Sequence, residues 1–160
     1  MPLSDIRAAI ATALSQVSAI GKVNAYDVLA TREEDFKAFF FDATLGYIQG
    51  WAITREMTTE EDRSLEDNWS THRMVIRGYR PIGAGGQTET AFQDKVEDVR
   101  DRLRREQRDQ LGGVGAPMVT FVGPPWVRIF EPRMFGSYLV HYAEILLIVR
   151  ESVGIGPAVT

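Results

Sequence analysis

Residues 138–150, YLVHYAEILLIVR, decide the fold class because both of their alternating sets of side chains are largely apolar. Successive side chains of a strand point to opposite faces of its sheet, so this pattern is typical of a strand that is covered on both sides. His141 and Glu144 are the histidine and the only carboxylate inside the stretch. We therefore predict a long buried strand whose inward-facing carboxylate needs a partner, because an unpaired buried charge is destabilising.

Two further strands are predicted upstream, at residues 47–57 and 69–79, the first of them from its alternating apolar side chains. The segment between them, residues 58–68, is predicted to be a connection, which we call the acidic arm. It carries one base, Arg63, against five acids: Glu60, Glu61, Asp62, Glu66 and Asp67. The two strands should form a hairpin that ends in a net charge of −4.

Hydroxyl side chains that suit helix N-termini predict where three helices begin, at Ser4, Thr31 and Thr88. Glycines predict the end of the first helix at Gly21 and of the third at residues 112–113. The apolar stripes are Ile6, Ile10, Leu14 and Val17 in the first helix, Phe36, Phe39 and Phe40 in the second, and Phe92, Val96, Val99 and Leu103 in the third.

Shorter strands are predicted at residues 22–28, as an edge strand, and at 118–122 and 126–131. No repeat or linker divides the chain. We therefore predict one α+β domain over residues 1–152, with a mostly antiparallel, mixed sheet and flanking α-helices. Residues 153–160 are predicted to be a C-terminal tail that is flexible or bound by a neighbouring copy.

Composition excludes several classes of protein and of site. The 160 residues are 44% hydrophobic and 25% charged, as in globular domains, and the formal net charge is −4. The absence of cysteine excludes disulfides, thiolate metal sites and cysteine nucleophiles. Two histidines are too few for the usual three ligands of a catalytic zinc. We expect no cofactor, no metal and no membrane partner.

Residues with catalytic chemistry do not converge on a known pattern. There is no G-x-S-x-G motif, and the glycine-rich residues 83–86 lack the lysine of a phosphate-binding loop. Arg73 or Arg77 is the predicted partner of Glu144, and a general acid at Glu144 is the alternative. We predict no catalytic residue.

Residues 100–109 hold five arginines and three acids, a net charge of +2 that suits a solvated or subunit-contacting helix face better than a nucleic-acid stripe. Because arginine pairs well with carboxylates at interfaces, we predict that this helix meets the acidic arm of another copy. The residues of this predicted subunit interface are Glu60, Glu61, Asp62, Glu66, Asp67, Arg100, Arg104, Arg105 and Arg108.

Several segments in this order resemble the small neck proteins of long-tailed bacteriophages, especially tail terminators and head–tail joining proteins. They are GWAITR at 50–55, HRMVIRGY at 72–79, GPP at 123–125, EPRMFG at 131–136 and HYAE at 141–144, with a charged helix from near Phe92. The resemblance covers residues 4–151. Its structural motif residues are Trp51, Arg77, Tyr79, Glu131, Pro132, Arg133, Phe135, Gly136, His141, Tyr142 and Glu144.

The resemblance implies a non-enzymatic virion protein with a tail-terminator-like α+β fold. Such a protein forms a ring, typically a homohexamer, that caps the tail tube and joins it to the head connector while DNA passes through. Its partners would be itself, the tail tube protein and the connector or adaptor protein, and it would be assembled in the host bacterial cytoplasm. Three alternatives remain: a connector-side adaptor, a small enzyme that uses His141, Glu144 and an arginine, and a nucleic-acid-binding module that uses residues 100–108.

Overall fold

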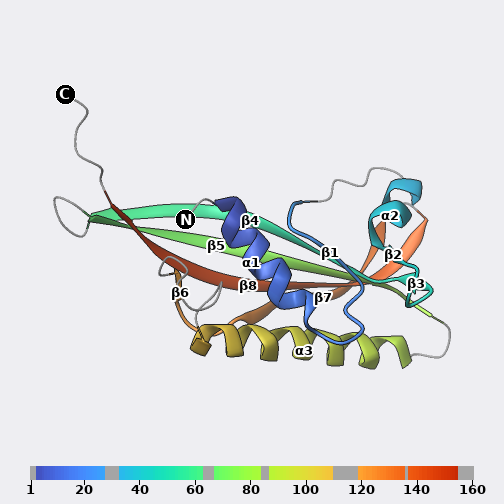
Figure 1. The fold of residues 1–160 in the computed structure, drawn as a ribbon. Coiled ribbons are helices and arrows are strands. Elements are labelled where there is room, and N and C mark those ends of the chain that lie inside the picture. The colour runs from blue at the N-terminus through green and yellow to red at the C-terminus, as the bar shows by residue number, and fades with distance from the viewer. Residues whose placement is uncertain are drawn as a thin grey trace.

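The computed structural model describes residues 3–27, 33–62, 67–83, 87–109, 119–135 and 137–154. Within them a long, twisted sheet lies against helices (Figure 1). The helices are α1 (Leu3–Ser15), α2 (Glu33–Phe40) and α3 (Gln87–Asp109). The strands are β1 (Lys22–Asn24), β2 (Phe41–Asp42), β3 (Tyr47–Ile48), β4 (Gly50–Asp62), β5 (Asp67–Pro81), β6 (Val119–Phe121), β7 (Trp126–Phe135) and β8 (Tyr138–Gly154).

The main sheet has the strand order β1-β4-β5-β8-β6, and β7 also pairs with β8. Only the β1–β4 pair is parallel, and the other pairs of this sheet are antiparallel. Strands β2 and β3 form a small second sheet. The prediction of an α+β fold with a mixed, mostly antiparallel sheet is therefore confirmed.

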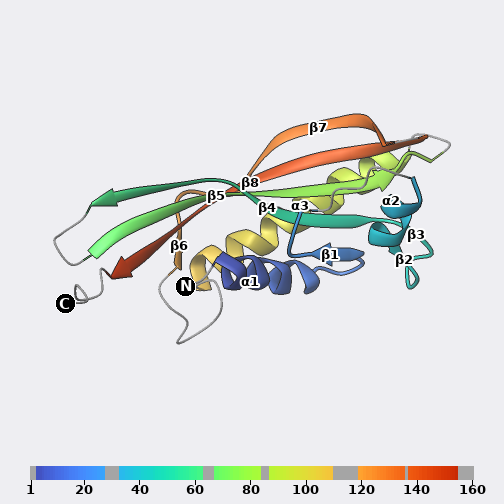
Figure 2. The same cartoon turned by 90° about the horizontal axis from the view of Figure 1, so that it is seen from above.

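The two faces of the sheet are covered differently, and β8 contributes to both. Four of its odd-numbered residues lie in a large core with the apolar stripes of α1 and α3: Ala143, Ile145, Leu147 and Val149. Its even-numbered residues Val140 and Tyr142 pack with α2 at one end of the opposite face. Figure 2 shows α1 and α3 together on one side of the sheet. The sequence pattern of a doubly covered strand thus matches this part of β8.

Two glycines allow large aromatic rings to lie directly on the strands. A Cβ at Gly78 would lie 2.4 Å from the ring of Trp51, and one at Gly50 would lie 2.1 Å from the ring of Phe40. Real Cβ atoms do not approach other atoms so closely, so each position needs a residue without a side chain. The fully buried Trp51 ring therefore depends on Gly78 of the neighbouring strand.

The predicted helix boundaries need correction. Ser4 lies inside α1, which begins at Leu3, and the helix ends at Ser15, well before Gly21. Gly21 has a left-handed φ of +85° where the chain enters β1. The hydroxyl of Thr88 does not cap α3: it accepts a hydrogen bond from the Gly83 N–H and pairs with His141. Thr31 and residues 112–113 lie outside the described residues.

The acidic arm is also corrected, because most of it is strand rather than connection. β4 continues to Asp62 and β5 starts at Asp67, with Thr58 opposite His72 and Asp62 opposite Asn68. Charged side chains are compatible with a strand whose faces are largely exposed to water, so the charge run did not mark a loop. Glu66 lies outside the described residues.

Other strand boundaries also differ from prediction. The predicted strand at residues 47–57 is divided, because Tyr47–Ile48 form β3 and β4 begins at Gly50. β1 covers only Lys22–Asn24 of the predicted edge strand, and β8 continues to Gly154, past the predicted strand end at residue 150 and the predicted domain boundary at residue 152. β7 continues through Pro132 to Phe135. Because β7 pairs only with β8 among the described strands, the missing N–H of this proline is tolerated at an outer edge.

Candidate functional site

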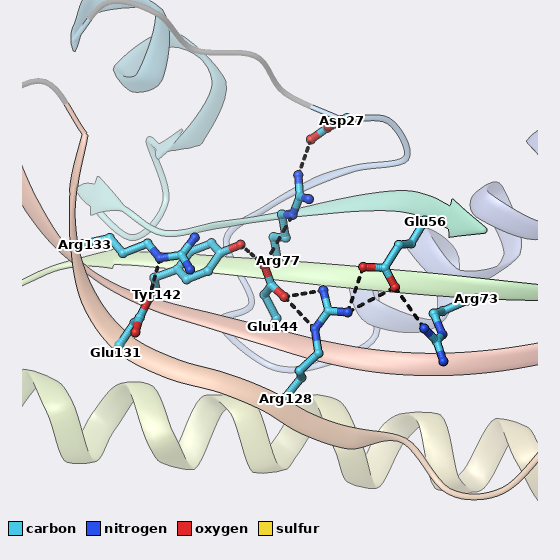
Figure 3. A network of polar contacts seen from close by, with 9 residues as sticks. All are labelled: Asp27, Glu56, Arg73, Arg77, Arg128, Glu131, Arg133, Tyr142 and Glu144. Atoms are coloured by element: carbon cyan, nitrogen blue, oxygen red, sulfur yellow. Dashed lines mark hydrogen bonds and ion pairs between the residues drawn. The ribbon is translucent and has the colours of Figure 1, made fainter.

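Glu144 is the centre of a polar network on the face of the sheet opposite α1 and α3 (Figure 3). Arg128 donates from Nε and Nη2 to its Oε2 at 2.9 and 2.6 Å, and the Tyr142 hydroxyl donates to its Oε1. Arg77, directly opposite on β5, places its Nε 3.8 Å from the carboxylate. The predicted ion pair with Arg77 is confirmed, whereas Arg73 contacts a different carboxylate, that of Glu56.

Two β-bulges position the outer members of the network. The register of β4 against β5 shifts between Arg55 and Met57, and the register of β7 against β8 shifts between Val127 and Ile129. The extra residues are Glu56 and Arg128, which bond to each other at 2.8 and 3.1 Å. A bulge re-aims one side chain of a strand, and here both aim into the same network.

The network connects four neighbouring strands and one loop. In strand order it includes Glu56 on β4, Arg73 and Arg77 on β5, Glu144 on β8 and Arg128 on β7. Arg77 also pairs with Asp27, which follows β1, at 3.0 Å. Three arginines therefore balance three carboxylates, and each of these ion pairs joins two different segments of the chain. The arrangement fixes the strands relative to one another.

The charge state of Glu144 follows from its contacts. Burial acts to raise the pKa of this carboxyl, but hydrogen bonds from Tyr142 and Arg128 outweigh it and hold the pKa below its usual value. Burial and the bond to Glu144 together raise the pKa of the Tyr142 hydroxyl, which stays protonated as the donor. Glu144 is thus an ionised acceptor at neutral pH, the wrong protonation state for the general acid considered from the sequence.

The aromatic side of the network joins it to the α2 end of the sheet. The Arg133 guanidinium lies 4.0 Å from the centre of the Tyr142 ring, and its Nε donates to Glu131 at 2.7 Å. Tyr79 and Phe135 pack on each other and on Phe36 of α2. Burial raises the pKa of Tyr79 to about 12. Seven residues of the resemblance are therefore gathered on this face: Arg77, Tyr79, Glu131, Arg133, Phe135, Tyr142 and Glu144.

Two other motif residues lie on the opposite face, with α3. Trp51 stacks on Phe92, and His141 stacks on the same ring while sharing a 3.0 Å hydrogen bond with Thr88. Burial lowers the pKa of His141. Because His141 and Glu144 point to opposite faces of β8, they do not form the joint site of the enzyme alternative. Pro132 lies on β7, and Gly136 is outside the described residues.

A second polar group ties together the projecting ends of three strands. His72 on β5 shares 2.9 Å hydrogen bonds with Thr58 of β4 through Nδ1 and with Glu151 of β8 through Nε2. His72 and Glu151 are both buried. Burial acts to raise the pKa of Glu151, but its bonds, including the one from His72, hold the pKa below its usual value. This group is a structural clamp between β4, β5 and β8.

The predicted interface residues are not brought together within one chain. Glu60, Glu61 and Asp62 are exposed at the end of β4, and no ion pair joins them to another described residue. On α3, Arg100 bonds Glu97 at 2.8 Å and Arg104 bonds Asp101, whereas Arg105 is exposed without a carboxylate partner among the described residues. Asp67 begins β5 and Arg108 is near the end of α3.

Sequence reasoning missed Arg128 and Glu56, the two bulge residues of the network. The only local signal for Arg128 is a charge between the apolar residues Val127 and Ile129. A bulge depends on the register of the partner strand, which periodicity along one strand does not reveal.

The described residues contain no group of three or more side chains suited to hold a metal ion. None of their helices has the length and apolar character required to cross a membrane. A scan against protein-family models finds no matching family, and a search of curated proteins finds no matching protein.

Proposed function

We propose that this chain is a structural subunit of a bacteriophage neck, in which six copies close into a ring that caps the tail tube and joins it to the head connector. One observation carries the assembly part of the proposal: a projecting, incompletely paired end of the sheet. The phage assignment rests on the sequence segments that resemble tail terminators. The α+β architecture is compatible with the fold that this resemblance implies.

The projecting end consists of residues 57–62 of β4, 67–72 of β5 and 149–154 of β8, which we call the hairpin extension. In both views it continues past the ends of α1 and α3 (Figures 1 and 2). β4, β5 and β8 are 13, 15 and 17 residues long, against about 5–6 for an average strand. The clamp at His72, whose side chain is buried, joins the three strands at the base of the hairpin extension.

The outer edge of β4 in the hairpin extension is available to pair with another chain. β1 pairs with β4 only as far as Ala52, and no other described strand pairs with that edge. Unpaired strand edges are sites at which another chain adds, and their charged residues limit the partners that fit. A contact between two different patches of neighbouring copies generates a closed ring when its rotation closes. We infer that the hairpin extension supplies one of these patches.

The charge of the chain is compatible with DNA passage through such a ring. The formal net charge is −4, and most arginines of α3 are neutralised by acids of the same helix. A mildly acidic wall does not retain the phosphate backbone. The proposal therefore places the protein in the virion, assembled in the host cytoplasm, with the tail tube protein and a connector or adaptor protein as neighbours.

The test of the proposal begins with mass measurement of the purified chain by native mass spectrometry, alone and with tail tubes of the host phage. The expected result is a closed oligomer, formed alone or on the tube end. Electron microscopy of the virion should then locate the ring between the tail tube and the portal. A ring that contacts the tube identifies a terminator, whereas a ring that contacts the connector identifies a connector-side adaptor. A chain that stays monomeric with tubes, or is absent from virions, would overturn the proposal.

A further inference from the structure

A groove lies between the C-terminal end of α1 and the middle of α3, on the helical side of the molecule. Its volume is about 260 Å³, and Gln16, Ser18, Arg102 and Arg105 are among the residues that line it. It is separate from the network around Glu144, which lies on the other face of the sheet. The groove is open to solvent and polar, so it suits a charged side chain better than an apolar ligand.

The acids that line the groove already have partners. Asp98 accepts from Lys95 at 3.0 Å, and Asp101 accepts from Arg104. Arg105 still has donors to offer, because it is exposed and pairs with no carboxylate among the described residues. Arg102 is held by Glu106 through Nη2, and its unbonded Nε is buried away from an incoming group. A carboxylate entering from outside would satisfy donors that the chain itself leaves free.

The hairpin extension carries the complementary charges. Glu60, Glu61 and Asp62 are consecutive, exposed and without an ion pair among the described residues. Because the hairpin extension leads away from α1 and α3, these carboxylates do not turn back onto the groove of their own chain (Figure 2). One chain therefore presents a free acidic patch and a free guanidinium on different parts of its surface.

We propose that the end of β4 from one copy docks in the α1–α3 groove of the next copy, with Arg105 as the anchor for a carboxylate of residues 60–62. This inference rests on the proposed function and names its contact surface. Each copy inserts its β4 end into one neighbour and accepts the β4 end of the other neighbour in its groove. The contact is therefore heterologous and repeats from copy to copy. Arg100 and Arg104 are also predicted interface residues, but they pair with acids of their own helix and are not the anchor.

Crosslinking tests the contact directly, because the chain contains no cysteine of its own. The double variant Glu61→Cys, Gln16→Cys, which places a cysteine in the groove and keeps the Arg105 anchor, is assembled and treated with a short bismaleimide. The expected result on a denaturing gel is a ladder from dimer up to the full ring. The matched control is Glu61→Cys with Asp94→Cys, an exposed position about 16 Å from Arg105 along α3, which should give no ladder. An assembled double variant that yields only monomer, or only dimer, overturns the inference.

Charge exchange gives an independent readout. Arg105→Glu should raise the concentration needed for half-assembly by about tenfold, and adding Glu61→Arg to it should restore assembly to within about threefold. Arg104→Glu is the control, because Asp101 and not a neighbouring copy is its partner. If the wild-type chain forms rings and Arg105→Glu has no effect, the groove inference fails while the proposed function stands. If the wild-type chain never assembles, both fail.

Discussion

The body of the sheet and the hairpin extension are made from the same three strands but are stabilised in different ways. In the body, α1 and α3 bury apolar side chains such as Trp51 and Ile145 completely. In the hairpin extension, Met57 is 46% exposed and the strands are joined by the polar clamp at His72. The body is therefore stabilised by a hydrophobic core, whereas the hairpin extension is an exposed surface whose strands are joined by polar contacts.

The largest expected effect separates these regions along one strand, β4. Trp51→Ala should lower the free energy of unfolding by about 3–5 kcal/mol, because it removes a fully buried ring that packs on Gly78 and Phe92. Met57→Ala, on the hairpin extension, should change it by less than about 0.5 kcal/mol. Urea denaturation followed by circular dichroism measures both. Similar losses for the two variants would contradict the division.

The network between the two regions should give the next largest effect. Glu144→Gln should lower the free energy of unfolding by about 2 kcal/mol at pH 7, because it leaves Arg128 and Arg77 without their shared carboxylate while these arginines keep partial access to water.

The same variant has a pH signature that follows from the lowered pKa of Glu144. The pKa of Glu144 is lower in the folded chain than in the unfolded chain, where a glutamate has a pKa of about 4.3. Its ionised form therefore stabilises the fold at pH values above about 4.3, and this stabilisation is lost as the pH falls through the folded-state pKa. The difference between wild type and Glu144→Gln should therefore shrink below about pH 4.3. Urea titrations at pH 7 and at pH 3 measure it, and an undiminished difference at the lower pH would argue against an ionised Glu144.

The clamp should matter locally rather than globally. Thr58→Val should cost about 1 kcal/mol, because the buried His72 loses its Nδ1 partner. Amide hydrogen exchange should become faster in the hairpin extension and stay unchanged in the body. Thr59→Val is the matched control, since Thr59 is exposed on the other face of the same strand. Equal exchange in the two variants would mean that the clamp does not hold the strand ends.

The smallest effect on stability is expected at the acidic end of β4. Changing Glu60, Glu61 and Asp62 together to lysine should alter the free energy of unfolding of the monomer by no more than about 0.5 kcal/mol, because these side chains are exposed. The same variant should assemble less well than wild type at low salt, where screening is weak. Sedimentation at low and high salt measures the difference. Unchanged assembly would remove the acidic end from the contact.

Much of the fold was predictable because burial imposes a period on the sequence. The stripe Phe92, Val96, Val99 and Leu103 marks α3, and the doubly apolar residues 139–149 mark β8. The helix N-caps were less predictable. Thr88 is a residue type that is common at N-caps, but its hydroxyl hydrogen-bonds with His141 of the distant strand β8. Charge is a poorer guide than apolar periodicity, since the run of acids at residues 60–62 predicts a connection but belongs to strand β4.

The sequence by itself determined the α+β class, the central β8 strand and the need of Glu144 for a cationic partner, because each follows from the local alternation of apolar and polar side chains. Only the tertiary structure decided which cations reach that carboxylate. Arg128 and Glu56 enter the network through bulges whose effect depends on the facing strand. Likewise, which arginines of α3 remain free depends on the acids one turn away. The periodicity of apolar residues along a chain predicts which side chains are buried. Which charged side chains pair with one another depends on how separate strands and helices are aligned in space.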